Sequence, residues 1–221
     1  HSNKKFIMNR VTETLGDLYG MHWPYKQHET SRDQRLLPYH EELKKAGACF
    51  GQAGEYERPM WYALGETKPN YEYSFNYQNW YPSVEQECKN TTVNVGLFEL
   101  TPFSKYEIKG EKAHDELQRL CTSNIKNEIG KCTYTHMLNE GAGIETDLTV
   151  VCIDKNHFRI ISAAAVRTHD KAHILKHLSS DVEFKDITDD LVCLGVFGPK
   201  SRDLLSKICK DDLSNENFKF G

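Results

Sequence analysis

The residues whose types and spacing could do chemistry lie in the stretch 132–152. Two runs rich in β-branched and apolar residues flank a glycine-containing turn, a pattern that predicts a β-hairpin. The second run carries an acid, Asp147, and the first carries the phenol of Tyr134. A carboxylate can relay a proton or stabilise positive charge, and a neighbouring phenol can orient it by hydrogen bonding. Taken alone, Asp147 is more often a strand-edge acid satisfied by the backbone or by an arginine.

The length of the hairpin loop decides whether these two side chains meet. A four-residue loop, 139–142, makes Tyr134 face Asp147 and His136 face Glu145, whereas a five-residue loop sends Tyr134 and Asp147 to opposite faces. We predict the shorter loop. We interpret His136 and Glu145 as a cross-strand pair that stabilises the hairpin rather than as an acid–base pair. The alternate positions then form the face directed to the core: Thr133, Thr135, Met137, Ile144, Thr146 and Leu148.

Bulk composition excludes several classes of protein. The chain has 221 residues and a net charge of -4, so a nucleic-acid partner is not expected. No apolar run approaches the roughly 20 residues of a membrane span. The seven cysteines include no C-x-x-C pair, which disfavours a zinc site and indicates free thiols in a reducing compartment. We therefore expect a cytoplasmic location, or the mitochondrial matrix if the protein is eukaryotic.

From residue 103 the pattern predicts the order β-α-β-β-β-α-β-β-α, which is typical of an α+β fold. The predicted strands include 104–109, 157–162, 182–187 and 191–197, and the predicted helices are 111–121, 170–178 and a last one opened by Pro199.

Before residue 103 the pattern is weaker. A short helix after Pro38 and a helix over 83–94 with Ser83 as N-cap are predicted. Residues 48–82 are dense in aromatic side chains, and their prolines, including Pro59, disfavour regular structure through most of the segment. This segment is interpreted as an ordered loop layer, with the alternative that it forms a wall for a flat aromatic ligand.

Three histidines, His169, His173 and His177, are spaced to share one helical face. Such spacing could hold a metal ion, but no carboxylate is clearly placed to complete a site. A solvent-exposed face is the preferred interpretation, and no metal site is predicted.

Several segments together resemble one family. The segments 96–110, 134–150, 162–170 and 194–202 are similar to the folate-binding aminomethyltransferase domain of glycine cleavage T-protein-like proteins, and the segments 18–24, 47–51, 57–61 and 77–80 to the dimethylglycine and sarcosine dehydrogenase-like subgroup. The resemblance implies an α+β fold with helices packed on an antiparallel or mixed sheet. It also implies that 1–47 is a linker from an absent upstream FAD-dependent oxidase domain. Residues 48–221 would form the folate-binding domain, truncated before its C-terminal barrel.

The resemblance also implies a reaction. In the relatives, oxidation of an N-methyl amine gives an iminium, and tetrahydrofolate captures its one-carbon unit as 5,10-methylenetetrahydrofolate. Asp147 matches the family aspartate at the folate, as charge-stabilising acid or base, and Tyr134 matches the tyrosine that orients it. Met137, Glu145 and Arg58 are the predicted folate-binding residues, with Arg58 equally able to pair with Glu55 or Glu57. FAD is expected only in the upstream domain, and little activity is expected of the isolated piece.

Two departures from the family pattern bear on these expectations. T-proteins proper carry an acid at the position of Thr146, and the oxidase-linked subgroup lacks this acid, as this chain does. T-proteins also carry an Asn near the position of Ala163. The second departure puts the pteridine contacts in doubt. The alternatives are a regulatory or binding protein that keeps this architecture without catalysis, and a different folate-linked methyl transfer. Retention of Tyr134 and Asp147 favours an enzyme.

Overall fold

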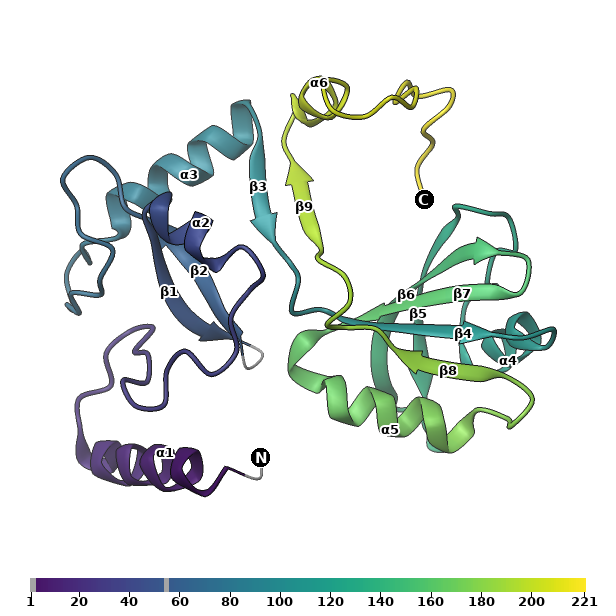
Figure 1. Cartoon of the computed structure of the whole chain (residues 1–221), viewed down its shortest axis with the longest axis horizontal. Helices are drawn as coiled ribbons and strands as arrows, with labels where there is room; N and C mark the ends of the chain where they lie inside the picture. Colours follow the sequence, from purple (N-terminus) through teal and green to yellow (C-terminus); the bar gives the residue numbers. More distant parts are fainter. Residues whose placement is uncertain (1–2, 54–55) are drawn as a thin grey trace. The chain divides into compact units, whose positions relative to one another are not determined.

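The computed structural model describes residues 3–53 and 56–221. The chain forms two compact units (Figure 1). The first unit comprises His1–Glu99 and Leu194–Lys210, and the second comprises Leu100–Cys193 and Asp211–Gly221. The second unit is therefore largely an insertion within the first. No helix of the described residues has the length and apolar character needed to cross a bilayer.

The first unit begins with a helix inside the predicted linker. Helix α1 (Lys4–Gly16) is capped by Asn3, whose side chain accepts a hydrogen bond from the Phe6 N–H at 3.1 Å, and the short 3₁₀ helix η1 (Asp17–Tyr19) follows it. The predicted helix after Pro38 is α2 (His40–Lys45). The boundary predicted after residue 47 stays a prediction.

Irregular structure was predicted for most of the aromatic segment, but its first part is regular. Strands β1 (Ala48–Ala53) and β2 (Tyr56–Tyr62) pair antiparallel. Cys49 pairs with Trp61 and Phe50 with Pro59, so Met60 is an extra residue that forms a bulge beside the proline. A bulge is one of the few places where a strand accepts proline, because a ladder hydrogen bond is already missing there.

The rest of this segment is the predicted ordered aromatic layer. Tyr71 and Tyr73 stack with ring centroids 5.5 Å apart, and both pack against the buried cluster of Cys49, Trp61 and Trp80. Helix α3 (Tyr81–Val93) follows, and it starts two residues before the predicted position. Ser83 is buried within its first turn and does not act as the N-cap.

The first unit also contains a two-stranded sheet formed by segments that are distant in the sequence. Strand β3 (Gly96–Glu99) pairs antiparallel with β9 (Leu194–Phe197), which leads to helix α6 (Ser201–Leu205). Gly198 between them has a φ of +114°, and a Cβ at this position would collide with the carbonyl oxygens of Asn94 and Thr91. Only glycine fits this connection.

The second unit is a five-stranded antiparallel sheet in the order β5-β6-β7-β4-β8. Its strands are β4 (Ser104–Lys109), β5 (Cys132–Leu138), β6 (Ile144–Asp154), β7 (His157–Ser162) and β8 (Glu183–Asp186). The predicted order of elements is confirmed, and the bounds of β4 and β7 are those predicted.

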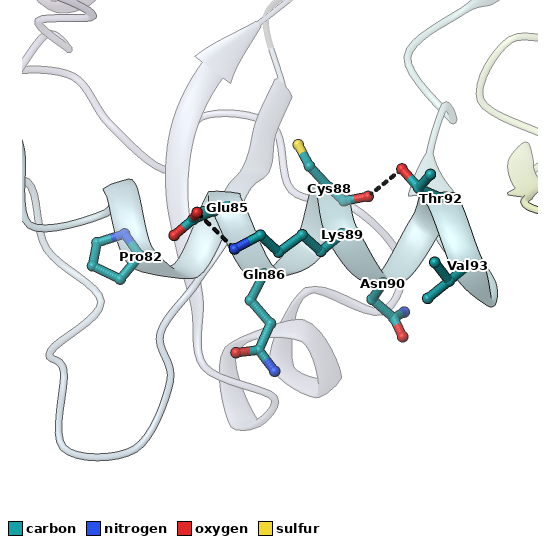
Figure 2. Close-up of a pocket in the computed structure, with 8 residues that line it drawn as sticks. All are labelled: Pro82, Glu85, Gln86, Cys88, Lys89, Asn90, Thr92 and Val93. Atoms are coloured by element: carbon teal, nitrogen blue, oxygen red, sulfur yellow. Dashed lines mark hydrogen bonds and ion pairs between the residues drawn. The ribbon is translucent and has the colours of Figure 1, made fainter.

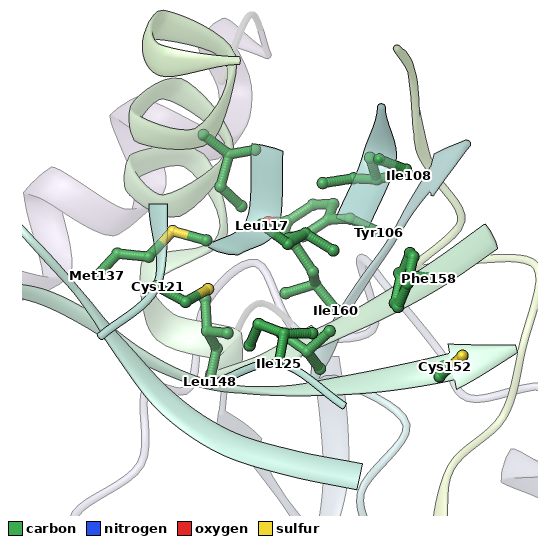
Figure 3. Packing of buried hydrophobic residues seen from close by; sticks show 13 residues of the cluster. Tyr106, Ile108, Leu117, Cys121, Ile125, Met137, Leu148, Cys152, Phe158 and Ile160 are labelled. Carbon is green, nitrogen blue, oxygen red and sulfur yellow. The ribbon is translucent and has the colours of Figure 1, made fainter. Parts of the chain in front are cut away.

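One face of this sheet is covered by helices α4 (Ala113–Leu120) and α5 (Arg167–His177), the latter preceded by the 3₁₀ helix η2 (Ala164–Val166). Figure 3 shows the core between them, in which Leu117 from α4 meets apolar side chains of the strands. Because side chains alternate along a strand, the residues between these core positions lie on the opposite face. That face carries Tyr134 and Asp147.

Candidate functional site

The β5–β6 hairpin has a five-residue loop, 139–143, and not the predicted loop of four. The Asn139 N–H donates to the Gly143 carbonyl at 2.9 Å, and Leu138 pairs with Ile144. The next pair is Met137 with Thr146, so Glu145 is an extra residue in a bulge. The longer loop inverts the faces of β6, and the bulge inverts them again. The two effects cancel from Thr146 onward, so Thr146 and Leu148 are buried as predicted, whereas Ile144 is exposed.

Tyr134 and Asp147 therefore share a face, but they are not directly opposite as predicted. Tyr134 pairs with Thr149, and His136 pairs with Asp147. The contact is diagonal: the Tyr134 hydroxyl donates to Asp147 Oδ2 at 3.2 Å, and this hydrogen bond raises the pKa of the phenol. Tyr134 is 61% exposed, and its ring lies edge-on to that of His136 at 5.3 Å. Within the described residues Asp147 makes no ion pair, and its side chain is exposed.

Glu145 does not pair with His136, and that prediction was wrong. Its Oε1 accepts a hydrogen bond from Asn139 Nδ2 at 2.8 Å, and its Oε2 lies 3.0 Å from His169 Nε2. These two contacts, with that of Asn139 the larger, lower the pKa of Glu145. The pairing was missed because the bulge turns Glu145 toward α5, away from the partner strand.

His169 also contacts Asp170, with 3.2 Å between its Nδ1 and Asp170 Oδ1. The hydrogen bond to Asp170, followed by that to Glu145, raises the pKa of His169. The solvent-exposed interpretation of the three histidines therefore misses the contacts of the first of them. In the part of the chain that the structure describes, no three His, Cys, Asp or Glu side chains are grouped to hold a metal ion.

Sequence reasoning passed over Asp170 as a site residue, although its position carried a signal. It precedes Ile174 by one helical turn, and both side chains are completely buried. An acid four residues before a core position lies on the buried face of its helix and needs a polar partner there. That partner is the hydroxyl of Thr146, which donates to Asp170 Oδ2 at 2.9 Å.

The two other predicted folate-binding residues lie in different settings. Met137 is completely buried in the core of the second unit. Arg58 belongs to the first unit, where its Nη2 donates to the Glu99 carbonyl at 2.6 Å. Its proposed pairing with Glu57 was wrong, because Glu57 binds Arg32 instead. Glu55, the alternative partner, lies outside the described residues.

Two hollows of the first unit involve α3. A cavity of about 630 Å³ includes Arg58, Met60, Glu87, Leu97 and Phe98 in its lining. A second one, of about 710 Å³, follows α3 itself from Pro82 to Val93, and Figure 2 shows the side chains that line it. Within it the Lys89 ammonium reaches the Glu85 carboxylate at 2.7 Å. Neither hollow includes a residue of the hairpin.

Models of known protein families match most of the chain. The family model described as "GCVT N-terminal domain" matches residues 39–221, and the model "FAD dependent oxidoreductase central domain" matches residues 1–36. The chain belongs to the GCVT family. The resemblance seen in the sequence and the α+β fold expected from it are thereby confirmed.

Relatives of this GCVT chain include oxidising enzymes. It is 39% identical over 217 residues to 4-methylaminobutanoate oxidase (formaldehyde-forming) of Paenarthrobacter nicotinovorans, covering 97% of this chain and 26% of the relative. It is 34% identical to mitochondrial dimethylglycine dehydrogenase of Rattus norvegicus, covering 98% of this chain and again 26% of the relative. The chain thus spans about a quarter of these relatives.

A solved structure shares the fold. Glycine cleavage system aminomethyltransferase T from Bartonella henselae matches with a TM-score of 0.64 and 25% sequence identity. The match covers 78% of this chain and 43% of that structure. This GCVT chain therefore shares the architecture of part of that aminomethyltransferase.

Proposed function

We propose that this chain is the tetrahydrofolate-binding module of an amine-oxidising enzyme, in which the one-carbon unit of an N-methyl amine is captured as 5,10-methylenetetrahydrofolate. The observation that carries the proposal is the hydrogen bond between Tyr134 and Asp147 on the face of the sheet opposite its apolar core. The GCVT match and the names of the relatives support the same function.

The carboxylate of Asp147 fits this chemistry. Tetrahydrofolate supplies amine nitrogens that accept a one-carbon unit and carry positive charge while they do so. A carboxylate without a cationic partner can stabilise such a charge and take up the proton that is released. The Tyr134 hydroxyl holds one carboxylate oxygen, Oδ2, and leaves Oδ1 for the ligand. Asp147 is thus the proposed catalytic residue, and Tyr134 orients it.

The other predicted folate-binding residues, cofactor and domains are proposed as well. Glu145 lies two residues before Asp147, while Met137 packs beneath the same hairpin. Contact of folate with these two residues and with Arg58 stays a prediction. The match of residues 1–36 to an FAD dependent oxidoreductase domain supports an oxidase portion in the same protein, which would generate the iminium. A downstream barrel is proposed from the family resemblance.

A titration of the full-length protein with 5-formyltetrahydrofolate, followed by calorimetry, tests the proposal. Asp147→Asn removes the charge while keeping the shape, and we expect it to weaken binding about tenfold or more, because a hydrogen bond to a charged group contributes about 1.5–3 kcal/mol. Tyr134→Phe should weaken it less. Glu140→Gln, an exposed change in the same hairpin loop, is the matched control. Unchanged affinity in Asp147→Asn, or no binding by the unaltered protein, would contradict the proposal.

A further inference from the structure

The two residues that precede Asp147 are both anchored to the first turn of α5. Glu145 Oε2 lies 3.0 Å from His169 Nε2, and Thr146 Oγ1 donates to Asp170 Oδ2 at 2.9 Å. Asp170 is completely buried, and Thr146 is 5% exposed. Two consecutive residues of β6 are therefore attached to two consecutive residues of a helix about 24 positions later in the chain.

The hairpin loop belongs to the same network. Asn139 donates from its Nδ2 to Glu145, while its Oδ1 accepts from the N–H groups of Gly141 at 3.0 Å and Gly143 at 2.9 Å. His169 closes the network by contacting Glu145 and Asp170 with its two ring nitrogens. One connected set of hydrogen bonds thus determines the loop, the bulge and the start of α5.

We propose that His169 and Asp170 are positioning residues for Asp147, because they hold the bulge that brings its carboxylate to Tyr134. β5 is the edge strand of the sheet, and a slip of one residue between it and β6 would send Asp147 to the other face. A buried carboxylate that needs donors is a strong determinant of one register, since any other leaves it unsatisfied. This inference rests on the proposed function, because the positioning of Asp147 matters for catalysis only if Asp147 binds tetrahydrofolate.

The carboxylates beside His169, Asp170 first and then Glu145, favour its protonated form and raise its pKa. Glu145 faces it from β6, and Asp170 adjoins it on α5. His173, the next histidine on that helix, stacks at 6.5 Å and opposes the charge, but its own pKa is lowered by burial and by His177. An imidazolium donates from both nitrogens and can bind both carboxylates at once. Loss of that proton removes one of the two donors, so the network should loosen as the pH rises through the pKa of His169.

The test follows the Tyr134 ring by NMR in protein with ¹³C-labelled tyrosine, with the resonance assigned by Tyr134→Phe. At neutral pH, Asp147→Asn defines where this resonance lies without its carboxylate partner. We expect His169→Gln and Asp170→Asn to move the resonance toward that position, and the unaltered protein to show a shift that follows the titration of His169. His173→Gln is the matched control, because it removes a neighbouring histidine of the same helix face that makes no hydrogen bond to the hairpin. It should leave the Tyr134 resonance in place.

A Tyr134 resonance that stays in its original position in folded His169→Gln would overturn the proposal. This variant changes a half-exposed side chain, so it keeps the test decisive even if Asp170→Asn fails to fold. Folate titration of the same variants separates this inference from the proposed function. If Asp147→Asn loses folate binding but His169→Gln keeps it, the positioning role is rejected and the proposed function stands. A displaced resonance without folate binding by the unaltered protein would reject the function alone.

Discussion

Two carboxylates of this chain lie in opposite settings, and the difference separates a structural acid from a candidate catalytic one. Glu57 is completely buried and accepts hydrogen bonds from Arg32 Nε at 2.9 Å, Arg32 Nη2 at 2.5 Å and the Asp33 N–H at 2.9 Å. Asp147 lies exposed and accepts only from a phenol among the described side chains. A carboxylate whose acceptor sites are filled stabilises the fold, whereas one with free acceptor sites can bind a ligand.

Removal of the Arg32 guanidinium should destabilise the protein, because Glu57 is then a buried charge without a partner. Arg32→Met leaves the Glu57 carboxylate buried without its ion pair, and we expect a loss of about 3 kcal/mol in the free energy of unfolding at pH 7. The matched control is the double variant Arg32→Met with Glu57→Met, which removes both charges and should recover part of the loss. Urea unfolding of the three proteins measures these changes.

The pH dependence of the same pair has a definite sign. Burial would raise the pKa of Glu57, but the hydrogen bonds from Arg32 and Asp33 outweigh it, and the pKa is lowered. The stabilisation is therefore complete above the unfolded-state pKa of about 4.3 and is lost as the pH falls through the lower folded-state value. The deficit of Arg32→Met should shrink at pH 4, because its unpaired Glu57 becomes protonated. An equal deficit at both pH values would refute the ion-pair account.

At the scale of elements, local pattern predicted the hairpin and its buried face but not its register. Alternation placed Thr135, Met137, Thr146 and Leu148 inside, and they are buried. The loop and the bulge depend on contacts of Asn139 and Glu145, the second of which reaches a helix remote in sequence. The sequence of the turn does not reveal a contact with a remote helix, so the register could not be predicted from it. The predicted contact of Tyr134 with Asp147 was confirmed, but the two residues are not directly opposite each other.

Elsewhere, tertiary packing overrode single-residue rules. Pro59 disfavours a strand, but the bulge at Met60 accommodates it within β2. Ser83 is a good N-cap by type, yet α3 starts two residues earlier and buries it. The segments with clear alternation or helical spacing, such as β4 and β7, were predicted with their bounds because one face of each is buried and mostly apolar.

The hairpin loop stores strain at a position that can be tested. Ala142 has a φ of +61°, in the left-handed region that costs an L-residue about 1–2 kcal/mol. Ala142→Gly removes that strain but increases the conformational entropy of the unfolded chain, which costs about 0.4–1 kcal/mol of stability. We therefore expect the free energy of unfolding to rise by roughly 0.5 kcal/mol. Ala142→Val, with a β-branched side chain, should lose at least about 1 kcal/mol. Thermal unfolding ranks the three, and a valine variant as stable as the unaltered protein would show that the loop conformation differs.

At the scale of the whole molecule, the GCVT match at 39–221 includes parts of both units, so the family domain is not one of them alone. Each unit nevertheless has its own buried cluster: one contains Trp61 and Trp80, and the other contains Leu117 and Met137. All three tryptophans of the chain, Trp23, Trp61 and Trp80, belong to the first unit. Tryptophan fluorescence therefore reports the unfolding of one unit only.

Separate cores predict separable unfolding. Leu117→Ala removes a completely buried side chain from the second core and should cost about 3 kcal/mol there. We expect amide hydrogen exchange to accelerate in β6 and β7, while the urea midpoint of tryptophan fluorescence changes little. Asp115→Ala, an exposed change on the same helix, is the control and should leave the exchange of β6 and β7 nearly unchanged. If the fluorescence midpoint falls in step with the loss of exchange protection, the two units unfold together, and the chain crossings after Glu99, Cys193 and Lys210 couple them into one cooperative structure.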